Sequence, residues 1–192
     1  MEKRLQGKVV IVTGAGSVGQ GIGNGKAAAI LYAREGANVL LVDHNHDAVD
    51  ETHKFIQAEN GVSHVLLADV SKTPDCRMII DTCLQVFGRI DILHNNVGIE
   101  LAGGLETTSE EAWDISLNVN LKSVFLLCKI AIPIMIGNGG GVITNISSIN
   151  AIRTLPTLSL PYAVSKAGMN AFTREVAIEY APKGTRIDTI LP

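Results

Sequence analysis

The segment VTGAGSVGQGIGNGKAAAILYAREGA, residues 12–37, decides the fold, because a strand must give way to a helix inside it. Glycines at positions 14, 16, 19, 21, 23 and 25 separate an apolar run from an alanine-rich one. A helix that began near Gly16 would contain the last four of these glycines, which costs about 3–4 kcal/mol relative to alanine. We therefore predict that the helix begins at Asn24 or Gly25, continues over 26–35 and ends at Gly36, where glycine suits a left-handed terminus.

The glycines before this helix form one long loop, 14–23, of bare backbone amides. A strand, such a loop and a helix N-terminus together favour an anion such as a pyrophosphate. The first three glycines also spell G-x-G-x-x-G, the dinucleotide fingerprint, although a single match is a weak signal. The alternative, a mononucleotide P-loop, fails because Gln20 stands where its first glycine should be, and Ala27 follows Lys26 in place of a hydroxyl residue.

Apolar, strand-like runs alternate with helical stretches along the whole chain. The runs cover 8–13, 38–43, 63–68, 90–95, 141–146 and 186–191. This alternation predicts parallel βαβ units, and the apolar content of the runs is typical of strands that helices cover on both faces. We predict a single α/β domain over 1–192, a three-layered, doubly wound, Rossmann-like parallel sheet with strand order 3-2-1-4-5-6 and right-handed crossovers.

Composition narrows the class of protein. The 192 residues are 46% hydrophobic and carry a net charge of −3, which gives no basic field that would attract nucleic acid or an anionic membrane. The start, MEKRLQGKVVIVTG, has no signal-peptide pattern, and Lys129 and Pro133 interrupt the apolar stretch 124–136. We expect a soluble cytoplasmic protein without nucleic-acid or membrane partners.

Cysteine and histidine spacing argues against a metal centre. Cys76, Cys83 and Cys128 are odd in number and lack a C-x-x-C spacing, so we expect reduced, mostly buried thiols. His44 and His46 form an H-x-H motif that could bind a metal, but no third ligand is evident in the sequence. We therefore predict no metal site.

Asp43 ends the second predicted strand, where a carboxylate can accept hydrogen bonds from both hydroxyls of an adenosine ribose. The same charge would repel a 2′-phosphate. No arginine or lysine lies between Gly14 and Gly25, and the neighbouring His44 is mostly neutral at pH 7. We therefore expect NAD as the cofactor, with an aspartate that caps a turn as the alternative interpretation.

Tyr162 and Lys166 lie four residues apart in SLPYAVSKAGMNAF, on one face of a predicted helix. An ammonium beside a phenol lowers the pKa of the phenol, because it favours the phenolate. Such a tyrosine can exchange a proton with an alcohol or ketone oxygen. The pair also occurs by chance, so it carries weight only in combination with other motifs.

Together these residues resemble the short-chain dehydrogenase/reductase family in its single-domain branch, over essentially the whole chain. The order and spacing of several motifs carry the resemblance. They are T-G-A-G at 13–16, the aspartate after the second strand, A-D-V at 68–70, N-N-V-G at 95–98, N-V-N at 118–120, N-I-S-S at 145–148 and Y-x-x-x-K at 162–166.

The resemblance implies that Tyr162 is the acid/base and that Lys166 tunes it and holds the nicotinamide ribose. It also implies that Ser148 hydrogen-bonds to the substrate oxygen and that Asn120 anchors a proton-relay water; Ser147 is the second candidate for the serine role. Tyr162 and Lys166 would contact the cofactor together with Gly14, Gly23, Gly25, Asp43, Asp69 at the adenine edge, Val70, Asn96 and Gly98. The resemblance makes Asn95 a structural residue of the fourth strand.

The sequence departs from the family pattern at two places. The family loop T-G-x-x-x-G-x-G is about five residues shorter, and Asp43 follows Gly14 by 29 positions where roughly 20 are usual. We assign Gly14 to the turn, Gly23 and Gly25 to close backbone approach and the helix start, and the other glycines to the loop. The second departure is a family P-G motif that stops at Pro192, so we expect that the chain is a fragment lacking its last strand.

The leading hypothesis is an NAD-dependent oxidoreductase that interconverts a secondary alcohol and a ketone, a small-molecule substrate. The alternatives are an NAD-binding regulator or scaffold without turnover, and a sugar-nucleotide epimerase or dehydratase, which would ordinarily need a larger substrate domain. Three leucines before Tyr162 suggest a partly apolar substrate wall; they are Leu155, Leu158 and Leu160. The resemblance also implies a homodimer or homotetramer joined along the predicted helices 109–132 and 162–180.

Overall fold

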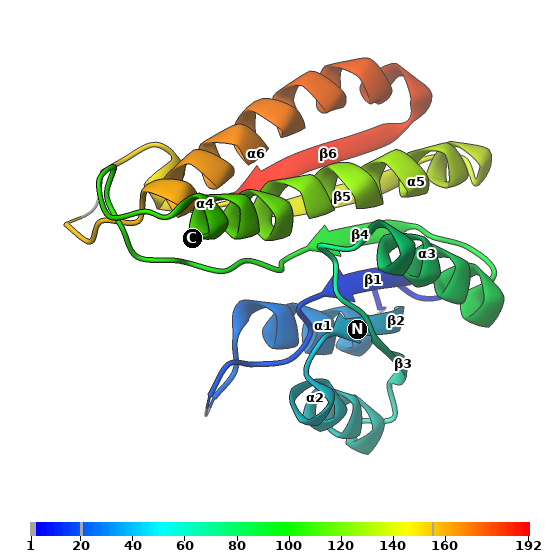
Figure 1. The fold of residues 1–192 in the computed structure, drawn as a ribbon. Coiled ribbons are helices and arrows are strands. Elements are labelled where there is room, and N and C mark those ends of the chain that lie inside the picture. The colour runs from blue at the N-terminus through cyan, green and yellow to red at the C-terminus, as the bar shows by residue number, and fades with distance from the viewer. Residues whose placement is uncertain (1–2, 20, 155) are drawn as a thin grey trace.

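The computed structural model of the protein describes residues 3–19, 21–154 and 156–192. Its centre is a sheet of six parallel strands in the order β3-β2-β1-β4-β5-β6, which confirms the predicted order. The strands are β1 (Val9–Thr13), β2 (Asn38–Asp43), β3 (Val62–Leu67), β4 (Ile92–Asn95), β5 (Gly141–Ile146) and β6 (Thr185–Ile190). In Figure 1 the chain starts at β1 in the middle of the sheet, and the red β6 forms one edge.

Helices cover both faces of the sheet, which gives the three layers (Figure 1). One face holds α1 (Asn24–Arg34) and α2 (His46–Ala58); the other holds α3 (Thr73–Phe87), α5 (Ser123–Gly137) and α6 (Leu160–Tyr180). The shorter elements are α4 (Glu110–Leu117), the π-helical turn η1 (Asn118–Lys122), and the 3-10 turns η2 (Ile149–Ala151) and η3 (Ala181–Lys183).

The central strand β1 shows why an apolar run without strict alternation folds this way. All five of its residues are buried. Val9 and Ile11 pack in the core cluster under α3 and α5, whereas Val10 and Val12 pack in the cluster under α1 and α2. Because successive side chains of a strand point to opposite faces, a strand with both faces covered needs apolar residues at every position.

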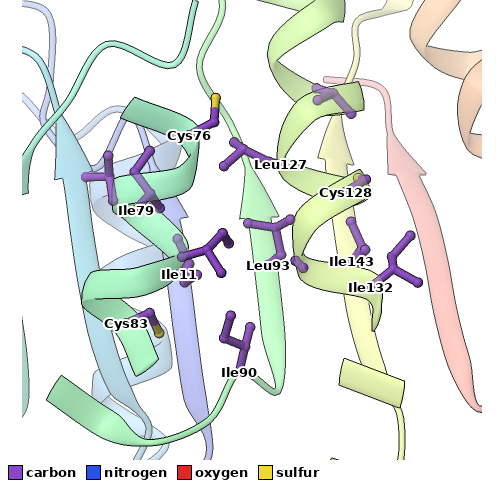
Figure 2. Packing of buried hydrophobic residues seen from close by; sticks show 14 of the residues in the cluster. Ile11, Cys76, Ile79, Cys83, Ile90, Leu93, Leu127, Cys128, Ile132 and Ile143 are labelled. Carbon is purple, nitrogen blue, oxygen red and sulfur yellow. The ribbon is translucent and has the colours of Figure 1, made fainter. Parts of the chain in front are cut away.

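The three cysteines belong to this packing. Cys76 and Cys83 lie on α3 and Cys128 on α5, and all three are buried and free, as predicted. Figure 2 shows them among Ile11, Leu93 and other apolar side chains between the two helices and the sheet. Burial raises the pKa of the Cys83 thiol and of the Cys128 thiol to about 12, so both stay protonated at neutral pH.

The helix after the glycine loop begins at Asn24, one of the two predicted residues, which keeps most of the glycines out of the helix. Helix α1 starts at Asn24 with Gly23 as its N-cap residue, and Gly36 follows its end with a φ of 91°. Four of the six glycines of the opening segment therefore lie in the loop before the N-cap residue, where glycine carries no helical penalty.

One helical stretch, Glu110–Gly137, is long and apolar enough to cross a membrane by length and composition. Core helices of globular proteins share this property. In this fold the α5 part packs against the sheet, where Leu127 and Met135 are buried. Burial in the core therefore accounts for the apolar residues on the face of α5 that packs against the sheet.

Candidate active site

An open pocket lies at the carboxyl ends of β4 and β5, beside the start of α6. Its lining brings together residues from distant parts of the chain, as parallel sheets do at the point where the strand order reverses. The lining residues are Asn24, Asn96, Gly98, Glu100, Ile146, Ser147, Ser148, Tyr162, Lys166 and Pro192. The pocket therefore contains both members of the predicted tyrosine and lysine pair, the two candidate serines, and two further residues expected to contact the cofactor, Asn96 and Gly98.

Tyr162 and Lys166 lie one turn apart on α6, with the Lys166 ammonium 5.6 Å from the centre of the Tyr162 ring. Lys166 is 2% exposed, and its Nζ donates a 2.6 Å hydrogen bond to the carbonyl oxygen of Ile146 at the end of β5. Burial lowers the pKa of Lys166 to about 8. The ammonium is therefore held between strand and helix, beside the Tyr162 ring.

The hydroxyl groups of the two serines after β5, Ser147 and Ser148, form different hydrogen bonds. Ser147 is buried and donates a 3.1 Å hydrogen bond to the backbone carbonyl of Lys166, so its hydroxyl ties β5 to α6. Ser148 is half-buried, and its Oγ accepts a 3.2 Å hydrogen bond from the backbone N–H of Asn150. That contact leaves the hydroxyl proton of Ser148 available to a substrate oxygen in the pocket.

Asn120 lies in the π-helical turn η1 and is fully buried. Its Oδ1 accepts from the N–H of Ile99 at 2.8 Å, and its Nδ2 donates to the carbonyl of Ile99 at 2.9 Å. Nδ2 also contacts the hydroxyl of Ser165 at 3.0 Å. The side chain therefore clamps the backbone at Ile99, and the water-anchoring role that the family resemblance implies for Asn120 stays a prediction.

Gly98 precedes Ile99, whose backbone Asn120 holds, and lies beside the ammonium group of Lys166. A Cβ at position 98 would lie 3.1 Å from the Nζ of Lys166 and 3.7 Å from the Oδ1 of Asn120. The ammonium therefore occupies the space that a side chain at position 98 would need, and glycine leaves it free.

The turn after β1 requires glycine at two of the predicted positions. Gly14 has a φ of 66°, and its carbonyl accepts a 3.0 Å hydrogen bond from the Nδ2 of Asn96. A Cβ on Gly25 would overlap the carbonyl oxygen of Gly14 and lie 2.5 Å from the same Nδ2. At Gly23 a Cβ would lie 3.4 Å from the Oγ of Ser17, 3.8 Å from its Cα and 3.9 Å from the carbonyl oxygen of Gly16, all ordinary contacts. Packing therefore does not require glycine at the N-cap position.

Gly16 is a residue whose role the sequence did not rank. Its N–H donates a 2.9 Å hydrogen bond to the Oδ2 of Asp43. A Cβ there would lie 2.7 Å from the Cβ of Ala48 on α2 and 3.1 Å from that carboxylate oxygen. Gly16 therefore lets the loop pack on α2. In the sequence, only its place as the second glycine of the G-x-G-x-x-G motif indicated a special role.

Asp43 lies in a second, smaller pocket formed by the ends of β2, β3 and β4. The residues that line it are Val42, Asp43, His44, Ala68, Asp69, Val70 and Val97. The second oxygen of Asp43, Oδ1, accepts a 3.0 Å bond from the N–H of Asn45, so the carboxylate also caps a turn. Each oxygen keeps a lone pair that can accept a hydroxyl, so both interpretations of Asp43 fit this geometry.

Asp69 and Val70 share this smaller pocket with Asp43, as expected. Hydrogen bonds from the side chain and backbone of Ser71, and the nearby Lys72 ammonium, lower the pKa of Asp69. The carboxylate is therefore ionised at neutral pH and fixes the turn after β3. Asn95 at the end of β4 is buried, and its Nδ2 donates a 2.8 Å bond to the Oδ1 of Asn145, which ties β4 to β5.

The expected leucine wall is not found among the described residues that line this pocket. The leucine wall is wrong for the described residues, because neither Leu158 nor Leu160 lines the pocket and Leu158 points into solvent at 68% exposure; Leu155 lies outside the described residues. For the metal, no group of three His, Cys, Asp or Glu side chains is placed to hold an ion within the ranges that the structure describes.

The sequence is similar to that of known oxidoreductases. Residues 8–192 match the family model described as short chain dehydrogenase. An uncharacterized oxidoreductase of Thermotoga maritima is 41% identical over 188 residues, which cover 98% of this chain and 72% of the relative.

Two solved structures extend the comparison. A putative short-chain dehydrogenase/reductase from Burkholderia xenovorans superposes with a TM-score of 0.97 at 41% identity, covering 99% of this chain and 75% of that one. A 7α-hydroxysteroid dehydrogenase complexed with NADH and 7-oxo glycochenodeoxycholic acid has a TM-score of 0.92 at 31% identity, over 100% of this chain and 72% of that one.

Proposed function

The chain belongs to the short-chain dehydrogenase family, and on that premise we propose that it is an NAD(H)-dependent oxidoreductase that interconverts a secondary alcohol and a ketone. The observation that carries the proposal is the convergence of Tyr162, Lys166 and Ser148 on one pocket at the carboxyl ends of the strands. A protein that only bound the cofactor would not need Tyr162, Lys166 and Ser148 together in one pocket.

The three side chains divide the work on the reacting oxygen. The phenol of Tyr162 gives its proton to the oxygen of a ketone, or takes the proton from an alcohol in the opposite direction. The Lys166 ammonium stabilises the phenolate that results, and the Ser148 hydroxyl donates a hydrogen bond to the same oxygen. The nicotinamide, when bound, supplies or accepts the hydride at the carbon.

The described residues fit a dinucleotide. Gly23 is the N-cap residue of α1 and carries no side chain, which suits the close approach of a pyrophosphate to the backbone amides of the first turn. The smaller pocket between Asp43 and Val70 suits an adenosine, and Asp43 has lone pairs for both ribose hydroxyls. Gly98 and Lys166 would border the nicotinamide side of the site.

A test of this proposal is a screen of secondary alcohols with NAD, and of ketones with NADH, in which the absorbance of the reduced nicotinamide is followed. Turnover of at least one alcohol or ketone that depends on Tyr162 supports the enzyme. NADH binding without turnover of any substrate in the screen would favour the regulator or scaffold instead.

We expect NADH to bind at least about tenfold more tightly than NADPH, because the Asp43 carboxylate repels a 2′-phosphate. Asp43→Ala should narrow this ratio. Titrations followed by the fluorescence of the reduced cofactors measure it, and Asp47→Ala, which removes a fully exposed carboxylate nearby, serves as the control. Equal affinity of the unmodified protein for the two cofactors would contradict the NAD preference.

We also propose that the protein works in the cytoplasm as a homodimer or homotetramer joined along α4, α5 and α6. A groove between these helices is lined by apolar side chains, among them Leu121, Phe125 and Phe172. Phe125 is 44% exposed, and Ile115 and Val164 add exposed apolar surface on the same helices. Such surface suits a self-complementary interface around a two-fold axis.

Light scattering at micromolar concentration should therefore give the mass of a dimer or tetramer, and Phe125→Glu should shift it toward the monomer. Phe55→Glu is the matched control, because Phe55 is similarly exposed but lies on α2. A monomeric mass for the unmodified protein, or the same shift in both variants, would contradict this interface.

A further inference from the structure

The loop after β4 carries an acidic residue into the active-site pocket. Asn120 holds both the N–H and the carbonyl of Ile99, at 2.8 and 2.9 Å, so the backbone of this loop is fixed at that residue. On one side of the clamp, Gly98 lies against the Lys166 ammonium. On the other side, Glu100 lines the same pocket as Ser148 and Tyr162.

The two charged residues that line this pocket differ in their exposure to solvent. Among its described lining residues, Lys166 is the basic one and Glu100 the acidic one. Lys166 is 2% exposed and its Nζ already donates to the Ile146 carbonyl, whereas Glu100 is exposed. Within the described part of the chain, Glu100 forms no salt bridge. The described lining therefore offers an exposed acidic residue and a basic residue that is buried.

The rest of the lining is also polar. Asn24, Asn96 and the two serines add amide and hydroxyl groups, whereas the apolar contributions come from Ile146 and Pro192. A carboxylate accepts hydrogen bonds and donates none, so its natural partner in a substrate is a hydroxyl or an ammonium group. It also disfavours a carboxylate or phosphate placed beside it.

We propose that Glu100 is a specificity-determining residue, and that the substrate is a diol, polyol or amino alcohol whose second hydroxyl or ammonium group donates a hydrogen bond to its carboxylate. This inference rests on the proposed alcohol and ketone chemistry and adds the substrate class. The carboxylate selects donors next to the reacting carbon and rejects 2-hydroxy acids and phosphorylated alcohols.

The test uses three probes that share a carbon skeleton and a secondary alcohol and differ in the charge of the neighbouring group. They are 1-amino-2-propanol, with an ammonium group, 1,2-propanediol, with a neutral hydroxyl group, and lactate, with a carboxylate. Their dissociation constants are measured by calorimetric titration with and without saturating NADH, for the unmodified protein and for Glu100→Gln. The glutamine keeps the size of the side chain and removes its charge. Glu106→Gln is the matched control, because Glu106 is an exposed acid farther along the same loop and lies outside the pocket lining.

We expect the unmodified protein to bind 1-amino-2-propanol and 1,2-propanediol more tightly than lactate. Glu100→Gln should reduce the preference for the amine over lactate by about tenfold, the effect of one charge at short range in a partly solvated site. NADH affinity should change by less than about twofold, and Glu106→Gln should leave all three constants unchanged.

An unchanged amine-to-lactate ratio in Glu100→Gln would overturn the proposal, as would the absence of detectable binding of all three probes. Different results would contradict the proposed oxidoreductase function: the absence of NADH binding, or turnover that persists in Tyr162→Phe. The probe titrations without NADH test the role of Glu100 even if the proposed function is wrong.

Discussion

Tyr162→Phe should lower kcat by about 10²–10⁴-fold, the usual contribution of a positioned acid/base, while the dissociation constant of NADH changes by less than about threefold. The variant removes only the phenolic oxygen, to which we assign the proton exchange with the substrate. The ring, its helix and the Lys166 contact to the Ile146 carbonyl stay in place, so the site keeps its shape. Stopped-flow measurement of NADH oxidation, together with fluorescence titration of NADH, separates the two effects.

Tyr180→Phe is the control for this experiment, because Tyr180 ends the same helix and lies outside the pocket lining. It should retain full activity. A loss in Tyr162→Phe smaller than about tenfold would mean that another group carries the proton. An equal loss of NADH affinity in that variant would instead point to a binding role for the phenol.

Gly25→Ala should destabilise the protein by about 3 kcal/mol or more, although helix propensity alone favours alanine by about 1 kcal/mol. The new Cβ would overlap the carbonyl oxygen of Gly14 and approach the Nδ2 of Asn96 to 2.5 Å. Both neighbours are held, since that amide donates to that carbonyl, and the turn has no flexible side chain that can yield. Urea denaturation measures the change in the free energy of unfolding.

Gly23→Ala is the matched comparison, two positions earlier in the chain. Its Cβ would meet the Oγ of Ser17 at 3.4 Å, and the extended backbone at Gly23, with φ −72° and ψ 167°, accepts alanine. We expect stability within about 1 kcal/mol of the unmodified protein, together with weaker NADH binding because the methyl group fills the space proposed for the pyrophosphate. Equal stability of the two variants would contradict the packing role assigned to Gly25.

Local patterns were sufficient to predict much of this protein. The cost of helical glycines placed the start of α1 correctly, because that cost depends only on the residues inside the helix. The alternation of apolar runs with helical stretches predicted the strand order, since short right-handed crossovers leave few arrangements of a parallel sheet. The resemblance carried by several motifs also named the tyrosine and lysine of the pocket, and their spacing of four residues places both on one face of α6.

The sequence left open whatever depends on which distant residues meet. Ser147 and Ser148 are adjacent and chemically alike, and only the packing of α6 against β5 turns one toward the Lys166 carbonyl and leaves the other half-buried at the pocket. Likewise, the leucines before Tyr162 look like a substrate wall until the course of that loop places Leu158 in solvent.

The sequence by itself thus determined the sheet and the start of α1, since these follow from propensity and periodicity along the chain. The resemblance to a family, carried by several motifs, added the candidate pair Tyr162 and Lys166. Tertiary structure decided that Asn120 clamps Ile99, that Gly98 makes room for Lys166, and that Glu100 reaches the pocket. The physical reason is that hydrogen bonding and close packing act between atoms that only the folded chain brings within a few ångströms of each other.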